Sequence, residues 1–199
     1  MGTENIFALI LGYILGSIPF GLFIAHFAGH GDIRNIGSGN IGATNVLRTG
    51  SKKLAIFTLL LDMGKAAAAA LLAAHFFGPI PSLIAGGAAL LGHCYPVWLK
   101  FKGGKGVATY FGVLFAVSWV IGLVAAGIWI ASALLTRIVS LSGILTSVFV
   151  PIAAYFMGYG KIAALCVVLG AIIILRHSEN IGRILAKTEP KLGAKKSEK

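Results

Sequence analysis

The sequence predicts an all-α, polytopic membrane protein whose helices cross the bilayer several times. Of its 199 residues, 57% are hydrophobic and only 12% are charged, and the mean hydropathy is +0.90. A single soluble core could not bury that much apolar surface, so we expect lipid to cover part of it. Because a bilayer core of ~30 Å needs roughly 20 apolar residues per helix, the chain is long enough for about seven transmembrane helices with short connections.

Apolar stretches of suitable length follow one another along the chain. We expect the spans over residues 6–27, 54–77, 81–99, 107–117, 120–136, 141–157 and 162–175. The fourth stretch is short, so a single longer helix over residues 107–135 is the alternative to two separate spans.

The distribution of Lys and Arg decides between these two topologies. With seven spans and the N-terminus outside, the cations fall on one side of the membrane and only Lys161 falls on the other. A merged helix would move Arg137 and the basic C-terminal end to the outside, against the positive-inside rule. We therefore predict a break near Ser118 and Trp119, an N-terminus outside and a cytoplasmic C-terminus.

We interpret the chain as one domain followed by a short tail. We expect a seven-helix transmembrane domain over residues 1–186 and a basic, polar tail over residues 187–199, which lies near anionic lipid and carries no chemistry. The net charge of +11 indicates anionic headgroups and anionic substrates, and not nucleic acid. His26, His30 and His75 have no carboxylate or cysteine at metal-ligand spacing, so we predict no metal site and no cofactor.

The first polar connection, residues 35–50 (NIGSGNIGATNVLRTG), indicates a phosphate-binding loop. Its glycines allow successive backbone N–H groups to turn toward one anion, and its small hydroxyl and amide side chains add donors. If residues 44–47 open a helix, Thr44 and Arg48 lie one turn apart and the helix N-terminus favours negative charge. A flexible re-entrant loop is the alternative, because glycine-rich polar loops are common.

The second polar connection, residues 92–109 (GHCYPVWLKFKGGKGVAT), has the same character. Lys100, Lys102 and Lys105 surround a group of glycines immediately before a span, which again suits an anion. The G-x-x-x-x-G-K-[ST] spacing of a P-loop is absent, so nucleotide hydrolysis is not indicated. Lysines at the cytoplasmic ends of spans also fix orientation, but that alternative leaves the glycines unexplained.

The third polar segment, RHSENIGR over residues 176–183, follows the last span and predicts an interfacial helix. His177 and Asn180 are three residues apart and would share a helix face, whereas Glu179 is placed to pair with Arg176 or Arg183. For His177, a polar cap on the end of the span is the alternative to a role in chemistry.

Two features inside the spans indicate packing more than chemistry. Asp62 and Lys65 lie on one face of the second span, where charges need partners, and we favour a structural ion pair over a proton path because no other span carries an acid. His93 is expected to help hold the second loop. Small residues are expected to let helices pack closely at Gly12, Gly16, Gly86, Gly87, Gly122 and Gly127.

In wording, order and spacing, these polar segments resemble those of the bacterial acyl-phosphate:glycerol-3-phosphate acyltransferases, the PlsY family. The similarity extends over nearly the whole chain and leaves out the basic tail. It implies an inner-membrane enzyme with seven spans and a cytoplasmic active site. Such an enzyme transfers a fatty acyl group from acyl phosphate to the 1-hydroxyl of sn-glycerol 3-phosphate, giving lysophosphatidate and inorganic phosphate. Its partners are these two substrates and membrane lipid, and we expect a monomer.

The resemblance also assigns roles to residues. It implies an essential serine and arginine in the first segment and a functional histidine and asparagine in the third, and it links the second loop to affinity for glycerol phosphate and Glu179 to structural integrity. The predicted catalytic residues are Ser38, Arg48, Lys105, His177 and Asn180. The predicted substrate-binding residues are Gly39, Asn40, Gly42, Thr44, Asn45, Lys102, Gly103, Gly104, Gly106 and Ser142.

A histidine followed five residues later by Asp, the signature of soluble-type acyltransferases, occurs nowhere in the chain. We hypothesise that a substrate phosphate, whose second pKa is about 6, accepts the hydroxyl proton. A phosphate or organophosphate transporter is the main alternative, although its site should lie near the midplane between related halves. A membrane phosphotransferase ranks third, because no acidic metal cluster is present.

Overall fold

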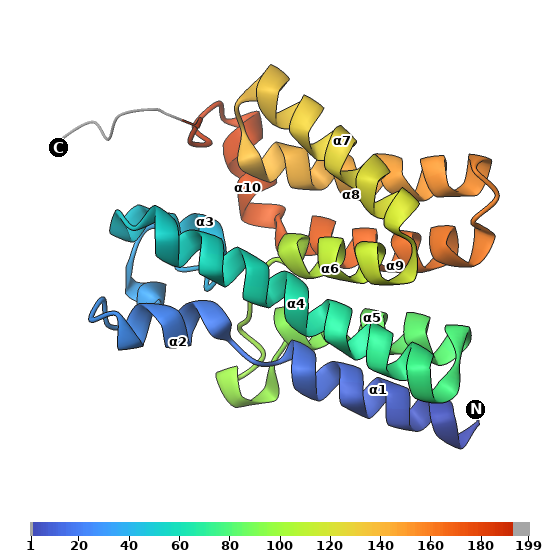
Figure 1. Cartoon of the computed structure of the whole chain (residues 1–199). Coiled ribbons are helices and arrows are strands. Elements are labelled where there is room, and N and C mark those ends of the chain that lie inside the picture. Colours follow the sequence, from blue (N-terminus) through green and yellow to red (C-terminus); the bar gives the residue numbers. More distant parts are fainter. Residues whose placement is uncertain (1, 193–199) are drawn as a thin grey trace, which may run out of the picture. The chain divides into compact units, whose positions relative to one another are not determined.

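The computed structural model describes residues 2–192, and these residues form helices without any strand (Figure 1). The α-helices are α1 (Thr3–Gly16), α2 (Phe20–Phe27), α3 (Ala43–Val46), α4 (Lys52–Phe77), α5 (Pro79–Cys94), α6 (Val107–Val117), α7 (Trp119–Thr136), α8 (Val139–Phe156), α9 (Gly160–Arg176) and α10 (Ser178–Leu185). Short 3-10 turns lie in the connections as η1 (Ile33–Asn35), η2 (Leu47–Thr49) and η3 (Val97–Leu99).

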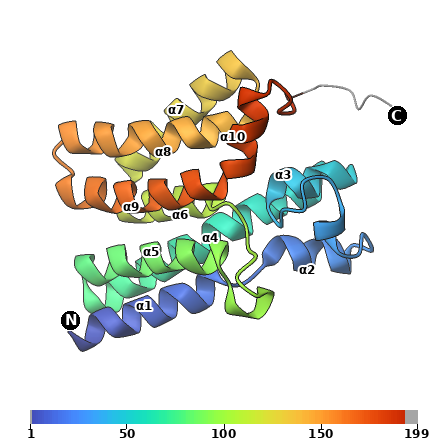
Figure 2. The same ribbon diagram turned by 180° about the vertical axis from the view of Figure 1, so that it is seen from behind.

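The helices pack as two compact units, with the boundary between Trp119 and Val120. In the first unit, α1 packs against α5, and α4 packs against α1, α5 and α6. In the second unit, α8 packs against α9, and α10 lies across one end of that pair (Figure 2). The first and second polar segments belong to the first unit, and the third belongs to the second unit.

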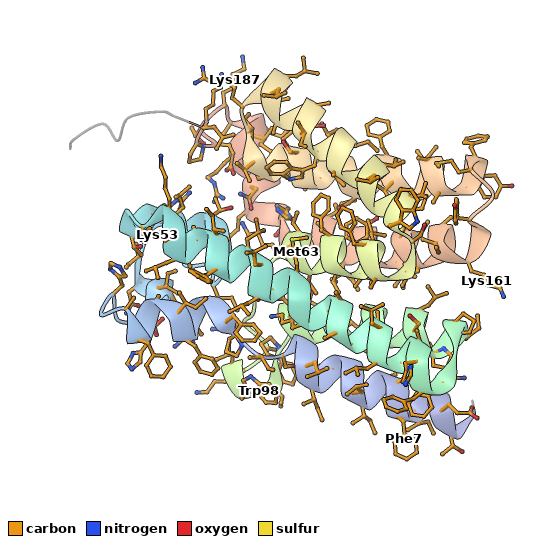
Figure 3. The ribbon with its side chains drawn as sticks, in the orientation of Figure 1. Phe7, Lys53, Met63, Trp98, Lys161 and Lys187 are labelled. Carbon is orange, nitrogen blue, oxygen red and sulfur yellow. The ribbon has the colours of Figure 1, made fainter. Side chains whose placement is uncertain are left out.

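The described part of the chain holds five helical stretches that are long and apolar enough to cross a bilayer, or six if α9 and α10 count as one span bent by 63°. Large apolar side chains such as Phe7, which is 57% exposed, project outward where lipid would cover them (Figure 3). These features agree with the predicted all-helical membrane protein. The predicted break near Ser118 is confirmed, because α6 ends at Val117 and α7 begins at Trp119.

The predicted first span, residues 6–27, lies within one stretch that is long and apolar enough to cross a bilayer, Thr3–Phe27, and its helix is broken into α1 and α2. Pro19 has no N–H to donate and disfavours helical backbone in the residue before it. The break exposes two carbonyl groups, and both find partners: Trp98 Nε1 donates to Ser17 O (2.9 Å) and Lys65 Nζ donates to Ile18 O (2.7 Å). Non-helical backbone at membrane depth needs such protein partners, since lipid offers none.

Glycines on α1 bring it into backbone contact with α5. A Cβ at Gly12 would collide with the carbonyl of Ala85, and one at Gly16 would collide with the carbonyl of Ala89. The packing role is therefore confirmed at these two positions. It is wrong for Gly127, where a Cβ would have nothing within 4 Å among the described residues.

We expect Gly16→Ala to lower the free energy of unfolding by about 1–3 kcal/mol, because a backbone carbonyl cannot move aside as a side chain can. Thermal unfolding of the purified variant in detergent measures the effect. Gly64→Ala is the matched control, since a Cβ at Gly64 in α4 would have no neighbour within 4 Å in the part of the chain that the structure describes. Equal melting temperatures for Gly16→Ala and the wild type would refute the close α1–α5 contact.

Candidate functional site

The side chain of Asn45 organises the first polar loop. Asn45 is 1% exposed. Its Oδ1 accepts from the backbone N–H (3.0 Å) and the Oγ (3.3 Å) of Ser38, and its Nδ2 donates to Ile33 O (3.0 Å) and Ile36 O (2.9 Å). The loop is thus folded around one buried amide. Both amide hydrogens of Asn45 are used inside the loop, so Asn45 fixes the position of Ser38; its contact with substrate stays a prediction.

Arg48 lies beside the same part of the loop. Gly37 adopts φ +61, and a Cβ there would lie 2.6 Å from Arg48 Cδ and 2.9 Å from Arg48 Nη1. The Arg48 side chain therefore packs against Gly37, next to Ser38. Ser38 and Arg48, which are both predicted catalytic residues, are exposed. Among the described residues, no carboxylate lies within 4.0 Å of the Arg48 guanidinium.

The other arginine of this region is already paired. Arg34 Nη2 lies 2.6 Å from Asp32 Oδ2, and Asp32 Oδ1 accepts from the Arg34 backbone N–H at 2.9 Å. The side-chain and backbone hydrogen bonds from Arg34 hold the pKa of the Asp32 carboxyl below its usual range. The charge of Arg34 is therefore paired with a carboxylate of the same connection at the surface, in contrast to that of Arg48.

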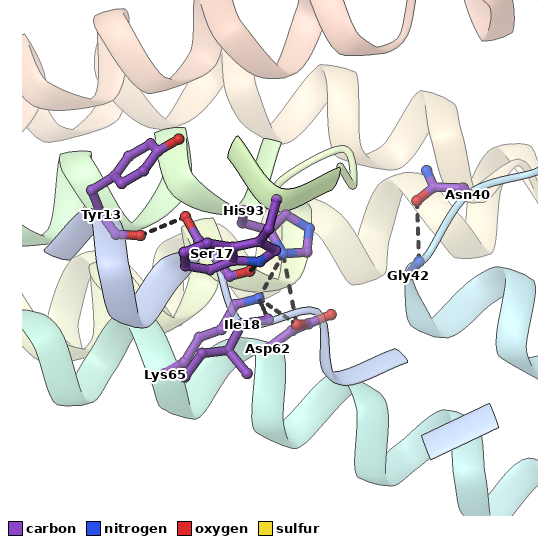
Figure 4. Close-up of polar contacts among 9 residues, drawn as sticks. Tyr13, Ser17, Ile18, Asn40, Gly42, Asp62, Lys65 and His93 are labelled. Atoms are coloured by element: carbon purple, nitrogen blue, oxygen red, sulfur yellow. Dashed lines mark hydrogen bonds and ion pairs between the residues drawn. The ribbon is translucent and has the colours of Figure 1, made fainter. Parts of the chain in front are cut away.

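The expected helix after the loop is shorter than a full phosphate-binding helix. Asn40 Oδ1 accepts from Gly42 N–H (3.1 Å), which turns the chain into α3 (Figure 4). The α3 helix spans only 4 residues, and Arg48 then lies in the 3-10 turn η2. Because the helix dipole acts through aligned peptides, so short a helix contributes little to anion binding. Thr44 at its start is exposed, and Gly39 adopts φ +69.

The second loop folds back onto the end of α5. Gly103 N–H donates to Cys94 O (3.1 Å), and Gly104 N–H donates to His93 O (3.0 Å). A Cβ at either glycine would collide with His93, at its carbonyl or its imidazole, so both positions require glycine. The predicted span over residues 81–99 agrees with the candidate span Pro79–Leu99. Within it, α5 ends at Cys94, two residues before Pro96, which cannot continue the helix.

This fold of the loop determines where the cations lie. Lys102 is exposed, whereas Lys105 is half-buried directly before α6. Gly106 adopts φ +87 and is the N-cap of α6, a conformation that favours glycine. The second polar segment follows α5 and the first precedes α4, so both lie toward the same end of the first unit (Figures 1 and 2).

A buried cluster beneath the second loop joins three sequence segments (Figure 4). Lys65 Nζ lies 2.7 Å from Asp62 Oδ1, with both side chains at most 3% exposed, which confirms the predicted ion pair. Lys65 Nζ also lies 2.9 Å from His93 Nδ1. Because an ammonium group only donates, a charged Lys65 makes His93 Nδ1 the acceptor of this hydrogen bond. The expectation that His93 holds the loop is confirmed by its carbonyl, which accepts from Gly104.

In the second unit, His177 and Asn180 flank the bend between α9 and α10. His177 is 3% exposed, and its Nδ1 lies 2.8 Å from the carbonyl of Ile173. A carbonyl only accepts, so Nδ1 carries the proton and, in the neutral ring, Nε2 has the lone pair. His177 therefore caps the end of α9, as the alternative interpretation held, and this cap also fixes its tautomer. Ser142 is buried in the first turn of α8, which contacts α10.

A carboxylate from the supposed tail completes this end of the second unit. Glu189 accepts from Ser140 Oγ (2.6 Å), Asn180 Nδ2 (2.6 Å) and Arg183 Nε (2.7 Å). Glu189 of the predicted tail is thus bonded to residues of α8 and α10, while the domain boundary at residue 186 stays a prediction and residues 193–199 lie outside the described residues. The signal was an acid close to the end of the last predicted helix, in a lysine-rich segment. Glu179 does pair with Arg183, but at 3.9 Å and with its side chain 80% exposed.

Comparison with known proteins gives one consistent result. Residues 6–187 match the family model described as glycerol-3-phosphate acyltransferase. The glycerol-3-phosphate acyltransferase of Brucella suis is 58% identical over 188 residues, which cover 94% of this chain and 93% of that protein. The corresponding protein of Mesorhizobium japonicum is 57% identical over 190 residues, which cover 96% of this chain and 97% of that protein.

Two crystal structures of PlsY (YgiH), an integral membrane glycerol 3-phosphate acyltransferase, are also similar. The glycerol 3-phosphate form has a TM-score of 0.89 and 43% identity, covering 95% of this chain and 96% of that chain. The lysophosphatidic acid form has a TM-score of 0.87 and 41% identity, covering 95% of each chain.

Proposed function

The chain belongs to the glycerol-3-phosphate acyltransferase family and acylates glycerol 3-phosphate, and we propose that its acyl donor is an acyl phosphate. The products are then lysophosphatidate and inorganic phosphate, with the acyl group on the 1-hydroxyl. The observation that supports this donor is the state of Arg48 beside Ser38. Arg48 is exposed and has no carboxylate partner among the described residues. Two substrates that each carry phosphate need such cations.

The proposed topology has about seven spans, an outer N-terminus and a cytoplasmic C-terminus, in the bacterial inner membrane. It is supported by the positions of Lys and Arg, which then gather on the cytoplasmic side. In this topology α6, although it has only 11 residues, crosses the membrane as a short span. We propose one catalytic domain over residues 1–186, acting as a monomer with its active site at the cytoplasmic face.

In the proposed reaction, the hydroxyl oxygen of glycerol 3-phosphate attacks the carbonyl carbon of the acyl phosphate. The new C–O bond forms, the bond from the carbonyl carbon to the phosphate oxygen breaks, and inorganic phosphate leaves. A phosphate oxygen accepts the hydroxyl proton, because phosphate titrates near neutrality. The donor already has a good leaving group, so positioning and charge neutralisation supply the remaining catalysis.

The predicted site residues divide between these two tasks. Arg48 and Lys105 neutralise phosphate, while Ser38, His177 and Asn180 orient the hydroxyl or the carbonyl. The contact of His177 Nδ1 with Ile173 O holds the imidazole in one orientation, which supports this role. The remaining substrate contacts stay predictions at Gly39, Asn40, Gly42, Thr44, Asn45, Lys102, Gly103, Gly104, Gly106 and Ser142.

We expect the purified protein, in detergent or lipid mesophase, to release phosphate from palmitoyl phosphate only when glycerol 3-phosphate is added. Palmitoyl-CoA in place of palmitoyl phosphate should give no lysophosphatidate, since it offers the cationic loops no acyl phosphate group. Mass spectrometry of the lipid product and a colorimetric phosphate assay provide the two readouts. Transfer from palmitoyl-CoA at an equal rate would contradict the proposed donor and leave the family assignment intact.

The family assignment decides against the transporter and phosphotransferase alternatives. A well-folded sample that acylates glycerol 3-phosphate from another donor would contradict the proposed donor and leave the family assignment unchanged.

A further inference from the structure

The residues after α10 return to the helices of the second unit. Thr188 N–H donates to Arg183 O (2.8 Å) and Lys187 N–H donates to Ile184 O (3.0 Å), while Lys187 adopts φ +58. This pair of bonds around a left-handed residue is a Schellman turn, which ends a helix and reverses the chain. The turn therefore directs the following residues back along α10.

The far end of this segment is tied to the turn between α7 and α8. Leu192 N–H donates to Arg137 O (2.7 Å), and Arg137 Nη2 donates to Leu192 O (3.2 Å). Residues 188–192, fixed at both ends, are called the C-terminal strap below. Its anchored backbone sets the position of the one acidic side chain that it contains.

That side chain is Glu189, which is 7% exposed. Its Oε1 accepts from Ser140 Oγ and Asn180 Nδ2, both at 2.6 Å, and its Oε2 accepts from Arg183 Nε at 2.7 Å. Burial opposes ionisation of this group, but the hydrogen bonds from Ser140, Asn180 and Arg183 outweigh it and hold the pKa of the Glu189 carboxyl below its usual range. Glu189 is a carboxylate at neutral pH.

An ionised carboxylate only accepts hydrogen bonds, so the amide nitrogen of Asn180 must face it. The Asn180 oxygen is thereby turned away from Glu189. The contact with Glu189 therefore sets which end of the Asn180 amide faces the carboxylate. The same carboxylate joins α10 to the first turn of α8 through Ser140, two residues before Ser142.

We propose that Glu189 is a positioning residue for acyl transfer, which fixes the amide of Asn180 and holds the first turn of α8 against α10. The inference rests on the proposed function, because it assumes that Asn180 meets the substrates. Glu189 itself acts through Asn180 and does not touch the reacting atoms. This inference extends the proposed catalytic domain beyond residue 186 to include the C-terminal strap.

The experiment measures kcat and KM for both substrates in Glu189→Ala, Glu189→Gln, Asn180→Ala and the double variant Asn180→Ala/Glu189→Ala. We expect Glu189→Ala to lower kcat on the order of 10- to 10²-fold, the range that misplaced catalytic groups produce. Glu189→Gln should lose less, because its amide oxygen still accepts from Asn180. The double variant should be no slower than Asn180→Ala alone. Lys191→Ala, which changes an exposed residue of the same strap, is the matched control and should keep wild-type kcat.

Each outcome has a defined meaning. Losses that multiply in the double variant, or wild-type kcat in both Glu189 variants while Asn180→Ala is impaired, overturn the positioning role alone. Full activity of Asn180→Ala contradicts its assignment to the site, and a wild-type protein that does not use acyl phosphate contradicts the proposed function. If Glu189→Ala fails to fold, Glu189→Gln decides: a lower kcat at an unchanged melting temperature supports the inference, and wild-type kcat refutes it.

Discussion

Replacement of Arg48 by alanine is expected to lower kcat/KM for acyl transfer by about 10²- to 10³-fold, the loss that follows removal of one well-placed donor to developing charge. Arg48 is exposed and lies next to Ser38. No carboxylate of the described residues lies within 4.0 Å of its guanidinium, so its charge is available to a phosphate. Phosphate release from palmitoyl phosphate, followed at saturating and limiting glycerol 3-phosphate, measures the effect.

Arg34→Ala is the matched control for this variant. Arg34 is an arginine of the same connection, but its guanidinium is paired with Asp32 at 2.6 Å on the surface. Because exposed ion pairs contribute ~0–1 kcal/mol, we expect its loss to change kcat/KM by no more than a few-fold. Equal activities for Arg48→Ala, Arg34→Ala and the wild type, in samples with the same melting temperature, would remove Arg48 from the site. Arg48→Lys should recover little, since an ammonium cannot bind phosphate through two parallel N–H donors.

The positions of the polar loops could be predicted because local sequence determines them. Glycines beside small polar residues are unfavourable in a span. The positive-inside rule, applied to Lys and Arg, predicted the break near Ser118 that separates α6 from α7. The pairing of Asp62 with Lys65 was also local, since three residues of spacing put both on one helix face. The presence of His93 as the third member of that cluster could not be predicted, because it depends on how α4 packs against α5 and not on spacing along the chain.

Features that depend on tertiary contacts could not be predicted from the sequence. Pro19 lies in an apolar run, and the carbonyls exposed at the helix break there accept from Trp98 and Lys65, which are far along the chain. Gly127 has the composition of a packing position, but a Cβ there would have no neighbour within 4 Å among the described residues. Glu189 was missed because a basic segment suggests a solvated tail, whereas a Schellman turn and the bonds between Leu192 and Arg137 return it to α8.

Lys65→Met is expected to lower the free energy of unfolding by about 3–5 kcal/mol, because it leaves the buried carboxylate of Asp62 without its partner. Asp62 and Lys65 are at most 3% exposed in their side chains, so water cannot replace the lost contact. The substitution also removes the donor to Ile18 O at the break between α1 and α2. Thermal unfolding and the yield of monodisperse protein in detergent measure the loss.

The double variant Asp62→Leu/Lys65→Met separates the two causes of this loss. Removing both charges abolishes the unpaired carboxylate but not the unsatisfied carbonyl of Ile18, which by itself costs about 1–3 kcal/mol. We therefore expect the double variant to be more stable than Lys65→Met and less stable than the wild type. If the ion pair is only structural, the double variant should still catalyse acyl transfer. Its rate should fall only as far as the substitutions displace His93 and the second loop. A double variant as unstable as Lys65→Met would show that the helix break, and not the buried charge, determines the requirement for Lys65.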